Sequence, residues 1–400
     1  MKRMKIDVEC AIERIKSTTL QKKKITAEHL DLDYVVLFSK DIASEILNQI
    51  ENSVEYLEGD LSKVKIHENL FTMVNKLNKC FYNTVLSQTF TPCGNYLVVG
   101  DIYGNISVFH LSKLVNQGST ITKEDQLPKN TFTIKEDVQI NSLLSTKSFL
   151  IVGTVGEILA YTWKNVKLSK KPSCSWSIDI PNAKDSFDKP DVNYLVLDDE
   201  DNLLYAACGD NNVYSFNLET RKEDRTLKGH KNYVHCLNYS NNKIVSGGED
   251  GLVIIWDVKS PTPVNKIEPF TRDKVVRPEL GNWIGGVGIN DDWLLCGGGP
   301  RLSLWHLRSM NISTVFPIDD KGIHVAEMFQ DKIFAGGRST LFYQMSFNGD
   351  IITEIPTSPV TTYTAVHQDE PFQTLCIAGS SPKIDVCSNF IYKNLQLSLY

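Results

Sequence analysis

Apolar positions follow two different spacings along the chain, and the spacing changes near residue 80. Between residues 42 and 57 apolar side chains recur every three or four positions, the period of a helix with one buried face; the stripe comprises Ile42, Ile46, Ile50, Val54 and Leu57. After residue 80 short apolar runs alternate with glycine, asparagine and aspartate, which is typical of strands joined by tight turns. The pattern predicts a partly helical N-terminal extension over residues 1–69 and an all-β domain over residues 70–400.

The β region contains one clear repeat unit. Residues 227–257 carry Gly229-His230 near their start and Trp256-Asp257 at their end, which is the G-H…W-D signature of a WD40 propeller blade. A buried indole N–H needs an acceptor, and a hydroxyl and an imidazole can continue the hydrogen bonding to a carboxylate. The structural tetrad expected in such a blade comprises His230, Ser246, Asp250 and Trp256.

Degenerate copies of this unit flank it on both sides. Each has a large or apolar residue at the expected end of its third strand; these residues are Phe109, Trp163, Phe216, Trp305, Tyr343 and Val386. With Trp256 they make seven copies, spaced by roughly 40 to 55 residues as four-stranded blades require. We therefore predict a seven-bladed WD40 β-propeller, whose closure removes exposed sheet edges. The last strand is expected to run from Ile391 to Leu399, and the sequence leaves open which strand closes the ring.

Net charge, cysteine spacing and the lack of long apolar stretches indicate which kinds of partner the chain is suited to bind. The chain of 400 residues has a formal net charge of -6, so it has no general attraction to phosphate backbones. Direct nucleic-acid binding would need a local basic patch, and the densest run of lysines is Lys22, Lys23 and Lys24. The nine cysteines are dispersed without a C-x-x-C pair, which favours reduced thiols over disulfides or a zinc site. Without a secretory signal or a long apolar stretch, no membrane partner is expected.

Several segments are more specific than a generic WD repeat. They are Gly281-Asn-Trp283-Ile-Gly285, Cys296-Gly-Gly-Gly299-Pro300 and Leu304-Trp305-His306-Leu307-Arg308-Ser309. Over residues 70–400 the chain resembles the THO complex subunit 6 family. The resemblance implies a nuclear WD-repeat scaffold of the TREX assembly, which supports mRNP assembly and mRNA export. The implied partners are other THO and TREX subunits, with RNA contact indirect or weak.

The N-terminal extension resembles a different family. Lys24-Ile-Thr-Ala-Glu28 and Ala43-Ser-Glu45-Ile46 look like the start of an AlkB-homologue DNA dealkylation dioxygenase, and the likeness covers about residues 24–66. It stops before the catalytic barrel of that family. Either a genuine fusion or a gene model that merges two neighbouring genes explains such a chain.

The sequence offers little catalytic chemistry. That dioxygenase family needs a His-x-Asp…His set of iron ligands, and the chain has two His-x-Asp strings, His29-Leu-Asp31 and His367-Gln-Asp369. One or two such strings are expected by chance. Nucleophile-elbow, zincin and P-loop motifs are missing from the sequence. We therefore expect no catalytic residue, no metal site and no cofactor.

Two groups of residues are candidates for binding. The candidate partner surface lies in the fifth blade and comprises Trp283, Trp293, Trp305 and Arg308. Core packing is the ordinary role of such tryptophans in a propeller, and an exposed interface hot spot is the alternative. The second group makes the loops around the second blade basic and comprises Lys129, Lys164, Lys167, Lys170 and Lys171. A solvated loop is the simpler interpretation of these lysines, and weak RNA contact is the alternative.

Three functions follow from these observations. The first is a non-catalytic scaffold subunit of the THO/TREX complex. The second is a WD-repeat substrate receptor for a cullin-type ubiquitin ligase, although Trp256-Asp-Val-Lys259 and Trp305-His-Leu-Arg308 each depart from the Trp-Asp-x-Arg motif of such receptors. The third is a DNA dealkylation dioxygenase, which would lack its catalytic core.

Overall fold

A computed structural model describes residues 78–115, 121–181, 189–260 and 262–400. The chain divides into two units, Met1–Asn78 and Lys79–Tyr400, and every strand described below lies in the second. The predicted helical stripe, the AlkB-like segment and the N-terminal lysines lie outside the described residues. Among the residues described, no helix has the length and apolar character needed to cross a membrane.

The described residues form seven antiparallel sheets, each made of four strands that follow one another in sequence. The first three sheets are β1–β4 (Val85–Phe90, Tyr96–Asp101, Asn105–His110, Asn130–Thr133), β5–β8 (Ser142–Ser145, Phe149–Gly153, Glu157–Thr162, Trp176–Asp179) and β9–β12 (Val192–Asp198, Leu203–Cys208, Asn212–Asn217, Lys222–Lys228). The fourth and fifth are β13–β16 (Val234–Ser240, Lys243–Gly248, Val253–Asp257, Pro263–Ile267) and β17–β20 (Ile284–Ile289, Trp293–Gly298, Ser303–His306, Asn311–Val315). The last two are β21–β24 (Ile323–Phe329, Lys332–Gly337, Leu341–Ser346, Ile351–Pro356) and β25–β28 (Thr362–Gln368, Thr374–Gly379, Lys383–Cys387, Leu395–Ser398).

Short helices occupy some of the connections between strands. Two are α-helical, α4 (Ser112–Val115) and α5 (Trp163–Leu168). Three are 3-10 turns, η3 (Lys123–Gln126), η4 (Pro269–Thr271) and η5 (Pro278–Leu280). The predicted third strand of the second blade therefore ends one residue earlier than expected, because Trp163 opens α5.

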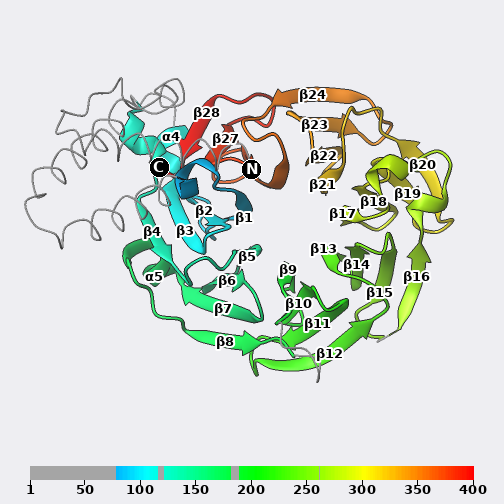
Figure 1. Ribbon diagram of the computed structural model, residues 1–400, viewed down its shortest axis with the longest axis horizontal. Coiled ribbons are helices and arrows are strands. Elements are labelled where there is room, and N and C mark those ends of the chain that lie inside the picture. Colours follow the sequence, from blue (N-terminus) through cyan, green and yellow to red (C-terminus); the bar gives the residue numbers. More distant parts are fainter. Residues whose placement is uncertain (1–77, 116–120, 182–188, 261) are drawn as a thin grey trace, which may run out of the picture. The chain divides into compact units, whose positions relative to one another are not determined.

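The seven sheets are arranged as a closed ring of blades (Figure 1). The first strand of each sheet packs against the first strands of both neighbouring sheets, and β1 packs against β25. The predicted all-β, seven-bladed WD40 propeller is thereby confirmed. No strand is exchanged between the first and last described blades, since β1–β4 and β25–β28 are each continuous in sequence.

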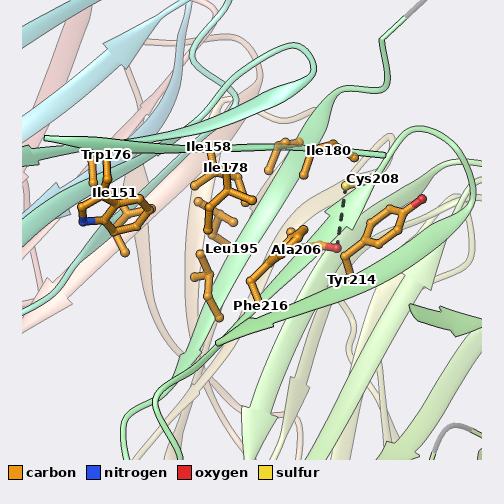
Figure 2. Close-up of a cluster of buried hydrophobic side chains, with 13 residues drawn as sticks. Ile151, Ile158, Trp176, Ile178, Ile180, Leu195, Ala206, Cys208, Tyr214 and Phe216 are labelled. Atoms are coloured by element: carbon orange, nitrogen blue, oxygen red, sulfur yellow. Dashed lines mark hydrogen bonds between the residues drawn. The ribbon is translucent and has the colours of Figure 1, made fainter. Parts of the chain in front are cut away.

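The hydrophobic core lies between the blades. The second strand of each blade is covered on both faces by its neighbours, and all six residues of β26 are buried. Figure 2 shows one such layer, in which side chains of β6–β8 pack against those of β9–β11. Burying apolar area contributes about 25 cal/mol per Å². Blade-to-blade packing of this kind explains why the second and third strands have nearly continuous apolar sequences rather than alternating ones.

Candidate functional site

The expected tetrad of the fourth blade is joined by hydrogen bonds. The indole Nε1 of Trp256 donates to Ser246 Oγ at 2.9 Å, and the same oxygen lies 2.8 Å from His230 Nε2. The other ring nitrogen, Nδ1, lies 3.0 Å from Asp250 Oδ1. The imidazole and the backbone N–H of Lys231 lower the pKa of Asp250 against the opposing effect of burial. Because every member hydrogen-bonds to another member, the tetrad has a structural role.

A buried arginine organises the start of the fifth blade. Arg277 donates from Nε to Gly299 O at 2.7 Å and from Nη2 to Gly298 O and Pro300 O, both at 3.2 Å. It also donates to Asp320, at 2.9 Å to Oδ1 and 3.0 Å to the backbone oxygen. The side chains of Arg277 and Asp320 are only 7% and 2% exposed. This arginine therefore fixes the Gly-Gly-Gly-Pro turn against the connection into the sixth blade.

Trp283 lies in a cradle made by close backbone approaches. Its Nε1 donates to Leu280 O at 2.9 Å. A Cβ added at Gly285 would lie 2.6 Å from the indole ring and 2.4 Å from Ile323 O, and one added at Gly322 would lie 2.8 Å from the ring. No real Cβ fits at these distances, so the glycines are required for the indole to lie where it does.

The indole begins a row of rings that crosses three blades. Trp283 stacks on His324 with ring centroids 4.9 Å apart, and His324 contacts Tyr363 at 5.0 Å. His324 and Tyr363 occupy β-bulges near the starts of β21 and β25, where the pairing register shifts. A bulge redirects the side chain of the extra residue. We call these three residues the aromatic ledge; Tyr363 is 38% exposed and the other two are partly buried.

The aromatic ledge is uncharged near neutral pH. Burial lowers the pKa of His324 to about 4, with smaller contributions from His235 and Arg338. A neutral imidazole between two aromatic rings offers a flat surface for apolar or aromatic contacts. The exposed residues Lys321 and Arg338 are joined by a backbone hydrogen bond of 3.1 Å, and Arg338 also bonds to Gly322 of the cradle. The arrangement is suited to binding rather than to proton transfer.

The four residues of the predicted partner surface lie in the fifth blade but have different environments. Trp305 is 0% exposed and donates from Nε1 to Ser303 Oγ at 2.9 Å. The expectation that Trp305 faces a partner is therefore wrong, because its indole fills the core between blades. Trp293 is partly buried against His306 and Phe347, whereas Arg308 is exposed on the opposite end of the blade from Trp283.

The His-x-Asp string of the last blade has structural neighbours. His367 Nδ1 lies 3.3 Å from Glu327 Oε2, and its ring contacts Phe329 at 4.2 Å between centroids. Among the described residues no group of three or more His, Cys, Asp or Glu side chains could hold a metal ion. The other string, His29-Leu-Asp31, lies outside the described residues.

Sequence reasoning missed Arg277, His324 and Tyr363. None belongs to a recognisable WD motif, and each acts through residues more than 20 positions away. The signal in the sequence was the clustering of tryptophans, since Trp283, Trp293 and Trp305 fall close together in the fifth blade. That clustering identified Trp283 but not its neighbours on other blades.

Comparison with known proteins supplies a second line of information. Residues 221–257 match the family model described as WD domain, G-beta repeat. The chain is 38% identical over 319 residues to "THO complex subunit 6 homolog" of Danio rerio, a match that covers 79% of this chain and 97% of that relative. It is 36% identical to "THO complex subunit 6" of Drosophila melanogaster, covering 82% of this chain and 93% of the relative. The human "THO complex subunit 6" is 34% identical, with 79% and 92% covered.

Proposed function

The chain belongs to the THO complex subunit 6 family, and from this membership we propose that it is a non-catalytic scaffold subunit acting in nuclear mRNA export. The observation that carries the proposal is the coverage of the relatives, since the matches extend over 92% or more of their length. A role as a THO complex subunit follows from that similarity. Its partners are then other THO and TREX subunits, and its site of action is the nucleus.

The propeller is suited to a scaffold because its two faces and outer rim offer separate surfaces. The two hydrogen-bonded networks of the candidate site stabilise the fold itself. The tetrad residues bond to one another, and Arg277 bonds to backbone carbonyls and to Asp320. We assign protein binding to the aromatic ledge, where Trp283 and Tyr363 combine large contact area with fixed positions. Tryptophan and tyrosine are enriched among residues that dominate interface energies.

The competing functions have less support. The relatives with the highest coverage are THO subunits, which favours neither a ubiquitin-ligase receptor nor a dioxygenase. The AlkB-like likeness of residues 24–66 stays a prediction about a segment outside the described residues. It does not enter the proposal.

Affinity purification of the tagged full chain from nuclear extract tests the assignment. We expect other THO subunits to co-purify at moderate salt, and the tagged chain to be nuclear by microscopy. Tyr363→Ala and Trp283→Ala should lower recovery at least ~10-fold, the effect of losing a hot-spot side chain. Tyr392→Ala, an aromatic that is 57% exposed elsewhere on the last blade, is the matched control.

Two results would overturn these proposals. Recovery of a ligase adaptor with no THO subunit would replace the scaffold assignment. Full recovery by the folded Tyr363→Ala and Trp283→Ala variants would remove the aromatic ledge from the partner surface while leaving the subunit assignment intact.

A further inference from the structure

One face of the propeller has an uneven distribution of charge. In every blade the turn between the first and second strands and the connection between the third and fourth strands lie at the same end, because the strands are antiparallel. We call this end the turn face. It is opposite to the end at which the first strands begin, and therefore opposite to the aromatic ledge.

Opposite charges lie on different blades of the turn face. In the first two blades, its described connections contain eight lysines and only two acidic residues, Glu124 and Asp125; the lysines are Lys113, Lys123, Lys129, Lys147, Lys164, Lys167, Lys170 and Lys171. In the other five blades the equivalent described connections contain ten acidic and four basic residues; the acidic ones are Asp199, Glu200, Asp201, Glu219, Asp291, Asp292, Asp331, Asp350, Asp369 and Glu370. A chain of negative net charge thus has a strongly basic sector.

Specific contacts hold α5 against strands of the first two blades, since it packs on β4, β6 and β7 (Figure 1). Trp163 Nε1 donates to Thr146 O at 2.8 Å, which ties the turn containing Lys147 to α5. The buried side chain of Asn130 donates to Val166 O at 2.9 Å and to Ser169 O at 2.8 Å. These bonds join the first blade to the helix that carries Lys164 and Lys167.

An aromatic pair lies within the same sector. Tyr96 and His110 stack with ring centroids 4.7 Å apart and planes 15° from parallel, and Lys167 Nζ lies 5.3 Å from the centre of the tyrosine ring. Burial lowers the pKa of His110, and the nearby Lys129 and Lys113 lower it further. The imidazole is therefore surrounded by lysine charge.

Most of the lysines beside α5 form no ion pair with another described residue. Asp125 is paired with Lys113 at 2.6 Å and lies 3.8 Å from Lys129. Within the part of the chain that the structure describes, four lysines are exposed and form no ion pair: Lys147, Lys164, Lys170 and Lys171. Several uncompensated positive charges in one place raise the local electrostatic potential and attract an anionic ligand.

The chemistry of the sector favours phosphates over a protein partner. Lysine is depleted from protein–protein interfaces, which rely on aromatic, Met and Arg side chains, whereas lysine clusters are typical of surfaces that contact phosphate oxygens. The neighbouring acidic connections repel phosphates, so they restrict a bound strand to the first two blades. A flexible strand can follow lysines spread over three connections and can also present bases to His110 and Leu168. Leu168 is 76% exposed.

We propose that the basic sector around α5 binds single-stranded nucleic acid, holding its phosphates with Lys147, Lys164, Lys167, Lys170 and Lys171. The acidic remainder of the turn face sets the boundary of the binding site. This activity is separate from subunit binding at the aromatic ledge, which lies at the other end of the blades.

Fluorescence anisotropy of the full chain with labelled U-rich RNA and dT DNA, each of about 15 nucleotides, tests the proposal. We expect binding that weakens with salt, with a slope of log K against log salt of about -3.5 for about five phosphate contacts. The variant K164E/K167E/K170E should bind at least ~10-fold more weakly and with a shallower slope. Comparison of the RNA and DNA strands shows whether the 2′-hydroxyl contributes.

The control variant K222E/K259E/R308E makes the same change in net charge on other blades of the turn face. It should bind nearly as well as the unsubstituted chain, provided that circular dichroism shows both variants to be folded. An equal loss in the control, or a loss confined to K22E/K23E/K24E in the N-terminal extension, would overturn the proposal. Binding of polyglutamate in preference to both strands would assign the sector to an acidic protein instead.

Discussion

Asn83 donates a hydrogen bond from Nδ2 to the hydroxyl of Tyr400 at 2.7 Å and joins two residues separated by 317 positions. The same nitrogen lies 2.8 Å from Asp101 Oδ2, and Asn83 is only 1% exposed. Nearby, Gln88 Nε2 donates to Thr364 O at 3.2 Å across the junction of the last and first blades. Side chains, rather than a shared strand, therefore fasten the ring where its ends meet.

Substitution of Asn83 should weaken this closure. Asn83→Ala leaves the buried Asp101 carboxylate with fewer partners, so we expect the free energy of unfolding to fall by about 2–3 kcal/mol. Tyr400→Phe removes one partly exposed acceptor and should cost about 1 kcal/mol. Urea denaturation measures both, and Tyr392→Phe at an exposed tyrosine is the control. Equal stability of Asn83→Ala and the control would show that packing alone closes the ring.

Removal of the buried Arg277 should have a larger effect. Arg277→Ala leaves the buried Asp320 side chain without its ion-pair partner and removes the donors that bind Gly298, Gly299 and Pro300. Breaking a buried pair by removing one partner costs about 3–5 kcal/mol. Urea denaturation of Arg277→Ala should show a loss of this size, while exposed Arg308→Ala should change stability by less than about 0.5 kcal/mol.

The tetrad offers a test in which the hydroxyl alone is removed. Ser246→Ala leaves the Trp256 N–H and one ring nitrogen of His230 without their buried partner. An unsatisfied buried polar group costs about 1–3 kcal/mol. We expect thermal unfolding of Ser246→Ala at a temperature lower by several degrees, roughly what ~1–3 kcal/mol produces in a domain of this size. Ser313→Ala on an exposed strand position is the matched control, and equal shifts would contradict the prediction.

The repeated blade and the tetrad within one blade could both be predicted from the sequence. The G-H…W-D unit gave the blade, and the spacing of third-strand residues gave seven copies, because both depend on residues within one sheet. The tetrad spans only residues 230–256, so its members could be named from one segment.

Relationships between blades could not be derived in the same way. Trp283, His324 and Tyr363 become neighbours only when three bulged first strands lie side by side around the ring. The sequence left Trp305 as a candidate for either the partner surface or the core, and only the packing between blades shows that it is buried. The uneven charge distribution of the turn face could not be predicted either, since it is apparent only when the connections of all seven blades are placed at one end of the ring.

Gly285 should accept no side chain. A Cβ there would lie 2.4 Å from Ile323 O, and since this contact is with backbone it cannot be relieved by a rotamer change. Gly285→Ala should lower stability by about 1–3 kcal/mol, the range for overpacking, and should change tryptophan fluorescence by displacing Trp283. Gly288→Ala in the same strand meets atoms only at 3.5 Å, so it should be neutral. A stable Gly285→Ala variant with unchanged fluorescence would contradict the cradle.

The low pKa of His324 should make stability depend on pH. Burial lowers its pKa from 6.5 to about 4, so the unfolded chain binds a proton between these values while the folded chain does not. The contribution is fully present above pH 6.5 and is lost as pH falls from 6.5 to about 4. Between pH 7.5 and 5 this amounts to at most about 2 kcal/mol. In urea denaturation, the free energy of unfolding of the unsubstituted chain should fall between pH 7.5 and 5 by up to this amount more than that of His324→Gln. NMR of ¹⁵N-histidine should show a neutral His324 ring at pH 5. The same loss in both proteins, or a protonated ring at pH 5, would contradict a neutral histidine in the aromatic ledge.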